Sequence, residues 1–188
     1  MPLLDVVTVN EEHENKEDLL EVIWRALEYF PGGLWEGANY LGNLNIKYDL
    51  KIKSKDDVYG AFMFSSLMEK IRRVRRMLQV KDLLLAVTCD PIITVYHRFE
   101  DGGFKRVANL VYDYVSSEIG VVSLFRIEYD RNAARVVAHG LGHNQGLRHH
   151  AEPIDVMCEG LLEHEKLRND GFCNECLKKM MKPILGEI

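Results

Sequence analysis

The chain has 188 residues, of which 47% are hydrophobic and 28% charged, and it contains 14 Gly and 5 Pro. This composition is that of a folded domain with a sizeable core, and it excludes a largely disordered chain. The formal net charge of −5 gives no reason to expect nucleic acid or an anionic membrane surface as a partner. No apolar stretch approaches the ~20 residues that a membrane-spanning helix needs.

The N-terminal segment lacks the basic residues and the long apolar stretch of a secretory signal. Cysteines outside a secretory context do not predict a disulfide framework. There are four of them: Cys89, Cys158, Cys173 and Cys176. We therefore expect a cytoplasmic, monomeric protein whose thiols are free to bind metal. Cys89 is expected to be a small core residue, because it ends an apolar run.

The first third of the chain alternates between strand and helix patterns. Leu3–Val9 is short, apolar and β-branched, which predicts a strand. Lys16–Phe30 has apolar residues at three- and four-residue spacing, which predicts an amphipathic helix ended by Pro31-Gly32-Gly33. Two weaker strand candidates follow at Gly37–Asn43 and Ile46–Ile52.

A second helix is expected to begin at Ser54-Lys55-Asp56-Asp57, whose polar residues are typical of a helix start. Its apolar spacing continues as far as Leu78 and leaves the arginines of Arg72–Arg76 on the outer face. We interpret these arginines as a solvated helix surface and not as a nucleic-acid site, since the rest of the chain supplies no basic surface.

Leu83–Thr88 is a continuous apolar run of strand length, which predicts a buried central strand. Three further strands are expected after it: Ile92–Phe99, Val107–Val115 and Val121–Ile127, with a turn at Asp101-Gly102-Gly103 before the second. The pattern is helical from Asp130 to Gly146. From Leu147 onward it is irregular until a short helix near Cys176–Met181.

The helical segment carries a metal-binding pattern. His139 and His143 lie one turn apart, so both imidazoles project from one face and can bind a single Zn²⁺ at ~2.0–2.1 Å. Gly146 can adopt a positive φ, end the helix and return His149 to the metal as a third ligand. The fourth position would then be open, as in catalytic zinc sites. His150 is the alternative third ligand, although the spacing favours His149.

These histidines match the metzincin metalloprotease motif H-E-x-x-H-x-x-G-x-x-H, except that Gly140 occupies the glutamate position. The glutamate takes a proton from the attacking water and delivers it to the leaving amine. General acid–base catalysis contributes ~10²–10⁴ in rate, so we expect weak or absent peptide hydrolysis and assign no catalytic residue. Glycine inside a helix also costs ~1 kcal/mol relative to alanine, so helix stability does not account for it.

The chain resembles the archaemetzincins, which extend this motif with a methionine and four cysteines. Met157 stands at the methionine position, Cys173-Asn174-Glu175-Cys176 matches the final C-x-x-C, and Val121–Arg126 is similar to the strand before the active-site helix. The resemblance runs from about Leu83 to Lys182.

The resemblance implies a fold of the α+β class (α/β/α-like), the metzincin fold. It has a twisted mixed sheet with two helices above an active-site cleft, a Met-turn at Met157 and a small loop-rich C-terminal subdomain. The expected division is 1–146 for the N-terminal subdomain and 147–188 for the C-terminal one. Val107–Val115 would form the edge strand of the cleft, along which an extended peptide pairs.

The resemblance also implies a second, structural zinc. The family's first two cysteine positions hold His150 and Asp155 here, while Cys173 and Cys176 remain. All four side chains are legitimate zinc ligands. Two other residues, Cys158 and His164, are possible substitutes for Asp155. The alternative is that the thiols are unliganded or form a labile disulfide.

The sequence is compatible with three functions. The first is a zinc-dependent peptidase acting on peptides, in which another acid, such as Glu152, Asp155 or Glu159, replaces the missing glutamate. The second is a non-catalytic zinc- or peptide-binding relative, in which Gly140→Glu should create activity. In the third, zinc only staples the C-terminal loops, so that a chelator would unfold them.

Overall fold

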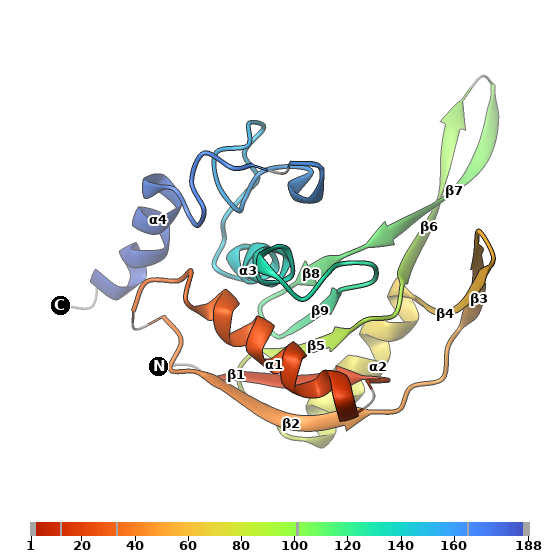
Figure 1. The fold of residues 1–188 in the computed structure, drawn as a ribbon, viewed down its shortest axis with the longest axis horizontal. Helices are drawn as coiled ribbons and strands as arrows, with labels where there is room; N and C mark the ends of the chain where they lie inside the picture. The colour runs from red at the N-terminus through yellow and green to blue at the C-terminus, as the bar shows by residue number, and fades with distance from the viewer. Residues whose placement is uncertain (1–2, 12, 33, 101, 165, 186–188) are drawn as a thin grey trace.

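The computed structural model describes residues 3–185 apart from 12, 33, 101 and 165, and the side chains of 13–16 and 182–185 lie outside the description. The outer limits of the two expected subdomains, 1 and 188, and the first residue of the expected turn at Asp101 are therefore outside the described residues. Figure 1 shows a central sheet with helices packed on it, a second sheet that projects to one side, and a C-terminal region of loops that ends in a helix.

The central sheet has five strands and is mixed. Four strands run parallel, and the fifth pairs antiparallel at one edge. The strand order is β2 (Ala38–Leu44), β1 (Leu4–Val9), β5 (Leu84–Thr88), β9 (Ile119–Ser123) and β8 (Asp113–Val115). The expected central strand is therefore β5, which has a parallel neighbour on each side.

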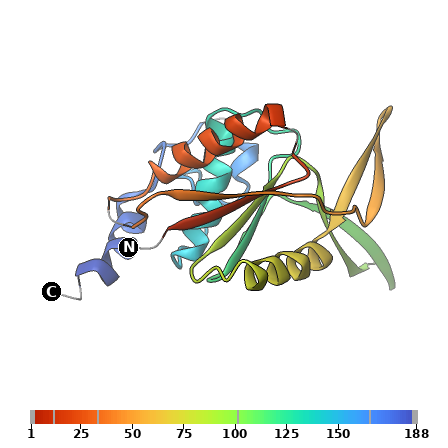
Figure 2. The ribbon, with the colours of Figure 1, turned by 90° about the horizontal axis from the view of Figure 1, so that it is seen from below.

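Helices cover both faces of this sheet. The two helices α1 (His13–Leu27) and α3 (Arg131–Asn144) lie on one face, and α2 (Phe64–Met77) lies on the other (Figure 2). Neighbouring residues of β5 point to opposite faces of the sheet. Leu85 belongs to the core between the sheet and α1 and α3, whereas Leu84 belongs to the core between the sheet and α2. Burial on both faces explains why β5 is apolar at every position but its last.

The second sheet has four strands, in the order β3 (Leu50–Ser54), β4 (Asp57–Met63), β6 (Ile92–Glu100) and β7 (Gly103–Val111). Its hairpins project away from the helical layers (Figures 1 and 2). Beyond α3, the chain forms a short 3₁₀ helix, η1 (Leu161–Glu163), and a last helix, α4 (Asn174–Leu185). Phe172, Cys176 and Met180 from this region join the core beneath α1 and α3.

The expected helix start at Ser54–Asp57 is wrong. These residues form the turn of the β3–β4 hairpin, in which Ser54 pairs with Asp57 and Lys55 has a φ of 55°. The helix begins at Phe64 instead, where the Asp49 carboxylate accepts hydrogen bonds from the backbone N–H of Met63 and from the Ser66 hydroxyl. A carboxylate distant in sequence thus holds the start of α2, and the residues just before Phe64 contain no capping side chain that would predict it.

The expected strand Val107–Val115 is divided between the two sheets. β7 ends at Val111, β8 begins at Asp113, and the carbonyl of the intervening Tyr112 accepts a hydrogen bond from Ser123 N at 2.7 Å. Of the two pieces, β8 is an edge strand of the central sheet and β7 is an edge strand of the second sheet. No helix among the described residues is both long and apolar enough to cross a membrane.

Candidate metal centre

The helix α3 presents two of the candidate ligands. Its first turn is capped by Asp130, whose side chain accepts a hydrogen bond from Asn132 N at 2.7 Å. Most of its length is buried, and His139 is only 7% exposed. His139 and His143 sit on the same face of the helix, with ring centroids 4.8 Å apart.

A sharp turn brings His149 to the same point. Gly146 adopts a φ of 76°, a conformation that side-chain-bearing residues rarely take. Just after Gly146, the backbone N–H of Leu147 donates a hydrogen bond to the carbonyl oxygen of Gly142 at 3.1 Å and closes the end of the helix. The His149 Nε2 atom consequently lies 3.1 Å from His139 Nε2 and 2.9 Å from His143 Nε2.

The tautomers of two of these histidines follow from their hydrogen bonds. His139 Nδ1 is 2.7 Å from the carbonyl oxygen of Val156, and His143 Nδ1 is 3.1 Å from that of Leu147, so each Nδ1 carries the proton and donates it. Both Nε2 atoms are then unprotonated, and they face one another at 3.1 Å. Converging lone pairs repel unless a cation lies among them. The three nitrogens therefore fit a metal ion that binds imidazole, such as Zn²⁺.

Electrostatics favour the neutral, ligating form of these rings. Burial lowers the pKa of His139, and burial likewise lowers the pKa of His143, where the neighbouring histidines add to the effect. Both rings thus keep their lone pairs at a lower pH than an exposed histidine does.

Met157 lies beneath the helix that carries these ligands. It is fully buried, and a Cβ added at Gly142 would be only 2.5 Å from its Sδ atom. A side chain at position 142 would therefore displace Met157, so the glycine lets the Met157 side chain pack directly against α3. Because the carbonyl that accepts from His139 belongs to Val156, this turn also orients the ligand.

A second group of four side chains lies nearby. The ligand atoms of His150, Asp155, Cys173 and Cys176 all lie within 4.8 Å of one another. His150 Nε2 is 3.3 Å from Cys176 Sγ, 3.6 Å from Cys173 Sγ and 3.5 Å from Asp155 Oδ2. These separations suit four ligands of one tetrahedral ion.

Asp155 is fixed in this second group by the backbone. It is fully buried, its Oδ1 accepts from Met157 N at 2.8 Å, and its Oδ2 accepts from Cys173 N at 2.7 Å. Burial, with the neighbouring Asp155 adding to it, raises the pKa of the Cys176 thiol. A bound cation would reverse this effect by favouring the thiolate. Cys173 and Cys176 are both free, with no disulfide between them.

The two groups are joined by consecutive residues. His150 forms an isolated parallel bridge with Cys158, and its N–H donates to the carbonyl of Met157 at 2.8 Å. Neighbouring side chains of an extended segment point in opposite directions. His149 therefore faces the three-histidine group while His150 faces the four-residue group.

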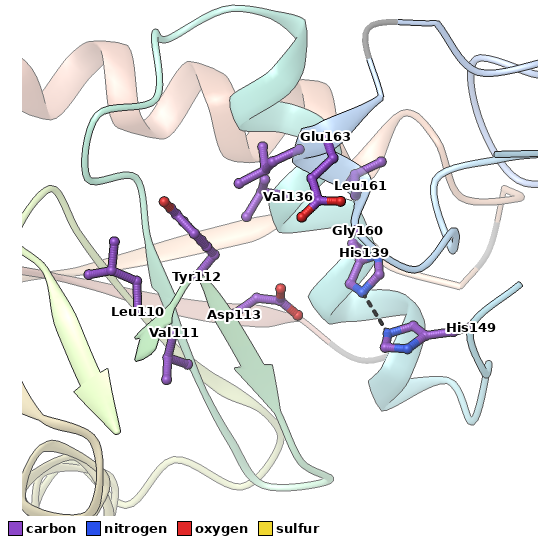
Figure 3. Close-up of a pocket in the computed structure, with 11 residues that line it drawn as sticks. Leu110, Val111, Tyr112, Asp113, Val136, His139, His149, Gly160, Leu161 and Glu163 are labelled. Atoms are coloured by element: carbon purple, nitrogen blue, oxygen red, sulfur yellow. Dashed lines mark hydrogen bonds between the residues drawn. The ribbon is translucent and has the colours of Figure 1, made fainter. Parts of the chain in front are cut away.

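An open cavity of about 390 Å³ lies against the three-histidine group (Figure 3). Residues 110–113 line one wall and residues 160–163 another, with His139 and His149 between them. A smaller hollow next to it is lined by Asp113, Tyr114, Val115 and all three histidines. Asp113 is a site residue that the sequence reasoning missed.

The acids that follow the motif are placed away from this cavity or are engaged elsewhere. Glu152 pairs with Arg168 at 3.3 Å, Glu159 is exposed, and Asp155 belongs to the second group. Of the suggested substitutes for Asp155, neither Cys158 nor His164 joins that group among the described residues. Cys89 is half-buried, in contact with the Tyr129 hydroxyl.

Comparisons with known proteins identify the fold. No family model matches the chain, and no curated protein matches it by sequence. Solved structures of zinc-dependent peptidase type do match: one from Methanocorpusculum labreanum is 16% identical with a TM-score of 0.60, covering 94% of this chain and 99% of its own.

Two of the matching structures are archaemetzincins. That of Methanopyrus kandleri is 18% identical with a TM-score of 0.61, covering 97% of this chain and 95% of its own. That of Archaeoglobus fulgidus, in complex with malonate, is 18% identical with a TM-score of 0.55, covering 95% and 99%. The chain therefore has the archaemetzincin fold, and the expected α+β architecture is confirmed.

Proposed function

We propose that this protein is a zinc-binding metallopeptidase of the archaemetzincin type, acting on peptides. The observation that carries the proposal is the convergence of three imidazole Nε2 atoms at 2.9–3.1 Å beside an open cavity. His139, His143 and His149 would hold the zinc. When bound, zinc would act as a Lewis acid toward water and toward the substrate carbonyl oxygen.

The surrounding residues have supporting roles in this proposal. Met157 is the floor of the zinc site, the Met-turn of the family. The substrate is an extended peptide that pairs with β8, which is an edge strand of the central sheet among the described residues. His150, Asp155, Cys173 and Cys176 would hold a second zinc, which has no open position and is structural.

A non-catalytic protein that binds zinc and peptide is the second candidate function. The observation that favours it is Gly140, because α3 offers no acid at the position where the motif has its proton acceptor. Zinc-loaded protein should be incubated with a peptide library under single-turnover conditions. Cleavage supports the peptidase, whereas peptide binding without cleavage at any pH favours the second candidate.

His149→Ala is expected to weaken zinc binding at the three-histidine site by more than ~100-fold, because removal of an outer-shell partner alone costs ~10–100-fold. Competition with a chelating dye measures the affinity. The matched control is His164→Ala, since His164 belongs to neither group of ligands. Equal affinities of His149→Ala and the unchanged protein would rule out this ligand assignment.

Cys176→Ser is expected to lower the zinc content from two ions to one per chain, as measured by atomic absorption. It should also destabilise the zinc-loaded protein by about 3 kcal/mol, because metal binding is coupled to folding of the C-terminal loops. Cys89→Ser should leave the zinc content unchanged, since Cys89 lies in neither group. A single zinc in the unchanged protein would contradict the second site.

A further inference from the structure

The space beside Gly140 is filled by the side chains of β8. A Cβ added at Gly140 would lie 2.9 Å from Val115 Cγ2, 3.2 Å from Asp113 Cβ and 3.3 Å from Asp113 Oδ2. The position from which a glutamate at 140 would extend is thus in van der Waals contact with another carboxylate. An acid is present at this point of the site, and it is supplied by the sheet instead of the helix.

The sequence directs Asp113 toward α3 for a simple reason. Asp113 and Val115 are two residues apart in a strand, so their side chains lie on the same face. Val115 is buried in the core shared with α3, and Asp113 pairs with Val122 of β9. The far end of the hairpin is also tied to the helix, because Asn144 Nδ2 donates to the carbonyl of Ser116 at 2.7 Å.

Asp113 faces the three histidines without belonging to their ligand set. It lines both hollows at the site, and in Figure 3 its carboxylate points from β8 toward His139 and His149. The described group of mutually close ligand atoms contains the histidines alone. The carboxylate is therefore placed to act on a water molecule bound beside the histidines and not to bind the metal ion itself.

Among the described residues, Glu163 is the other acid that lines the larger cavity, and it is placed less well. Its side chain is exposed, and its Oε2 lies 3.1 Å from the point where a Cβ of Gly160 would be. It does not line the smaller hollow that all three histidines share. The Glu163 carboxylate thus lies close to Gly160 in its own loop, whereas Asp113 lies against Gly140 in the helix that carries the metal ligands.

We propose that Asp113 is the general base of this site and takes the place of the glutamate that Gly140 lacks; this rests on the proposed peptidase function. An Asp113 carboxylate oxygen removes one proton from the water as the water oxygen bonds to the peptide carbonyl carbon. The same oxygen then gives this proton to the amide nitrogen as the C–N bond breaks. The remaining proton of the water passes to the released amine, which leaves an ammonium and a carboxylate.

The first measurement is peptide cleavage by zinc-loaded Asp113→Asn, which keeps the size of the side chain but cannot accept the proton. We expect kcat to fall by ~10²–10⁴, with KM within about twofold and zinc content unchanged. Glu118→Gln, an exposed acid in the β8–β9 turn, should keep full activity. The proposal would be overturned if Asp113→Asn cleaved peptide at the wild-type rate. It would also be overturned if Glu163→Gln, and not Asp113→Asn, showed the large loss of kcat.

A second measurement does not require turnover. Acetohydroxamic acid releases a proton when it binds a metal ion, so a nearby carboxylate that accepts this proton strengthens binding. Asp113→Asn should weaken acetohydroxamate binding to the zinc-loaded protein about tenfold or more, while azide, which has no such proton, should bind the variant at least as tightly as it binds the wild type because a nearby negative charge is removed. Unchanged acetohydroxamate affinity would overturn the role of Asp113.

The two measurements separate the two proposals. If the wild type cleaves no peptide but Asp113→Asn still loses acetohydroxamate affinity selectively, the peptidase function fails and Asp113 stands as the proton acceptor of the metal site. If the wild type cleaves and neither measurement responds to Asp113→Asn, the peptidase function stands and the assignment of Asp113 fails. If no zinc binds to the three histidines, both fail.

Discussion

Gly140→Glu, the change that would complete the metalloprotease motif, is expected to destabilise the protein by about 3 kcal/mol and to create no activity above that of the unchanged chain. The reason is that a Cβ at this position would already lie 2.9 Å from Val115 Cγ2 and 3.2 Å from Asp113 Cβ. The longer side chain would also place a second carboxylate against that of Asp113. Denaturant unfolding and peptide cleavage measure the two effects.

Gly140→Ala is the matched control, because it adds only the Cβ. Alanine is better than glycine in a helix by ~1 kcal/mol, yet we expect this variant to be about 1 kcal/mol less stable than the wild type, since the buried Val115 has to move. Combining Gly140→Glu with Asp113→Ala should cost less than the sum of the two single changes, because both act on one contact. A Gly140→Glu protein that is as stable as the wild type and cleaves faster would contradict this account.

Asp113→Asn is expected to stabilise the zinc-free protein by about 3 kcal/mol above pH 6, with a gain that disappears as the pH falls toward 3.8. Burial raises the pKa of Asp113 from 3.8 to about 6, although His143 and His149 oppose the change. Between these values the folded state binds more protons than the unfolded state, so folding stability falls as the pH rises through this window. The difference between the two pKa values corresponds to about 3 kcal/mol.

Urea unfolding of both zinc-free proteins over a range of pH tests this prediction. Glu118→Gln should show no comparable gain, because Glu118 is exposed. Zinc should reduce the difference, since a cation near the carboxylate favours its ionised form. A constant difference between Asp113→Asn and the wild type at every pH would show that ionisation of Asp113 is not its cause.

Much of the fold was predictable because the pattern of burial is local. The run Leu83–Thr88 is apolar on both faces because helices cover both faces of β5, and Asp130 starts α3 with a cap from its own side chain. The start of α2 was not predictable in this way. The carboxylate that holds its start belongs to Asp49, which precedes it by an entire hairpin.

In the candidate site, too, the residues with a local sequence pattern were predictable and the residue from a distant segment was not. His139, His143 and His149 come from one helix and the turn after it, so their spacing alone suggested that they meet. Asp113 comes from a strand of the central sheet, and nothing local connects it to the histidines. Two features could have drawn attention to it: an acid within a predicted strand, and a glycine in α3 that helix stability does not explain. Only the structure shows that the absent side chain of this glycine leaves room for Asp113.

The place of Asp113 on β8 has a consequence for how substrates would be selected. A base carried by the helix keeps one position relative to the metal ligands, whatever occupies the cleft. Here the base belongs to the three-residue strand whose free edge would receive the peptide backbone. Binding of the peptide and the position of the base would then depend on the same strand. Peptides too short to pair along this edge should lose turnover as well as affinity.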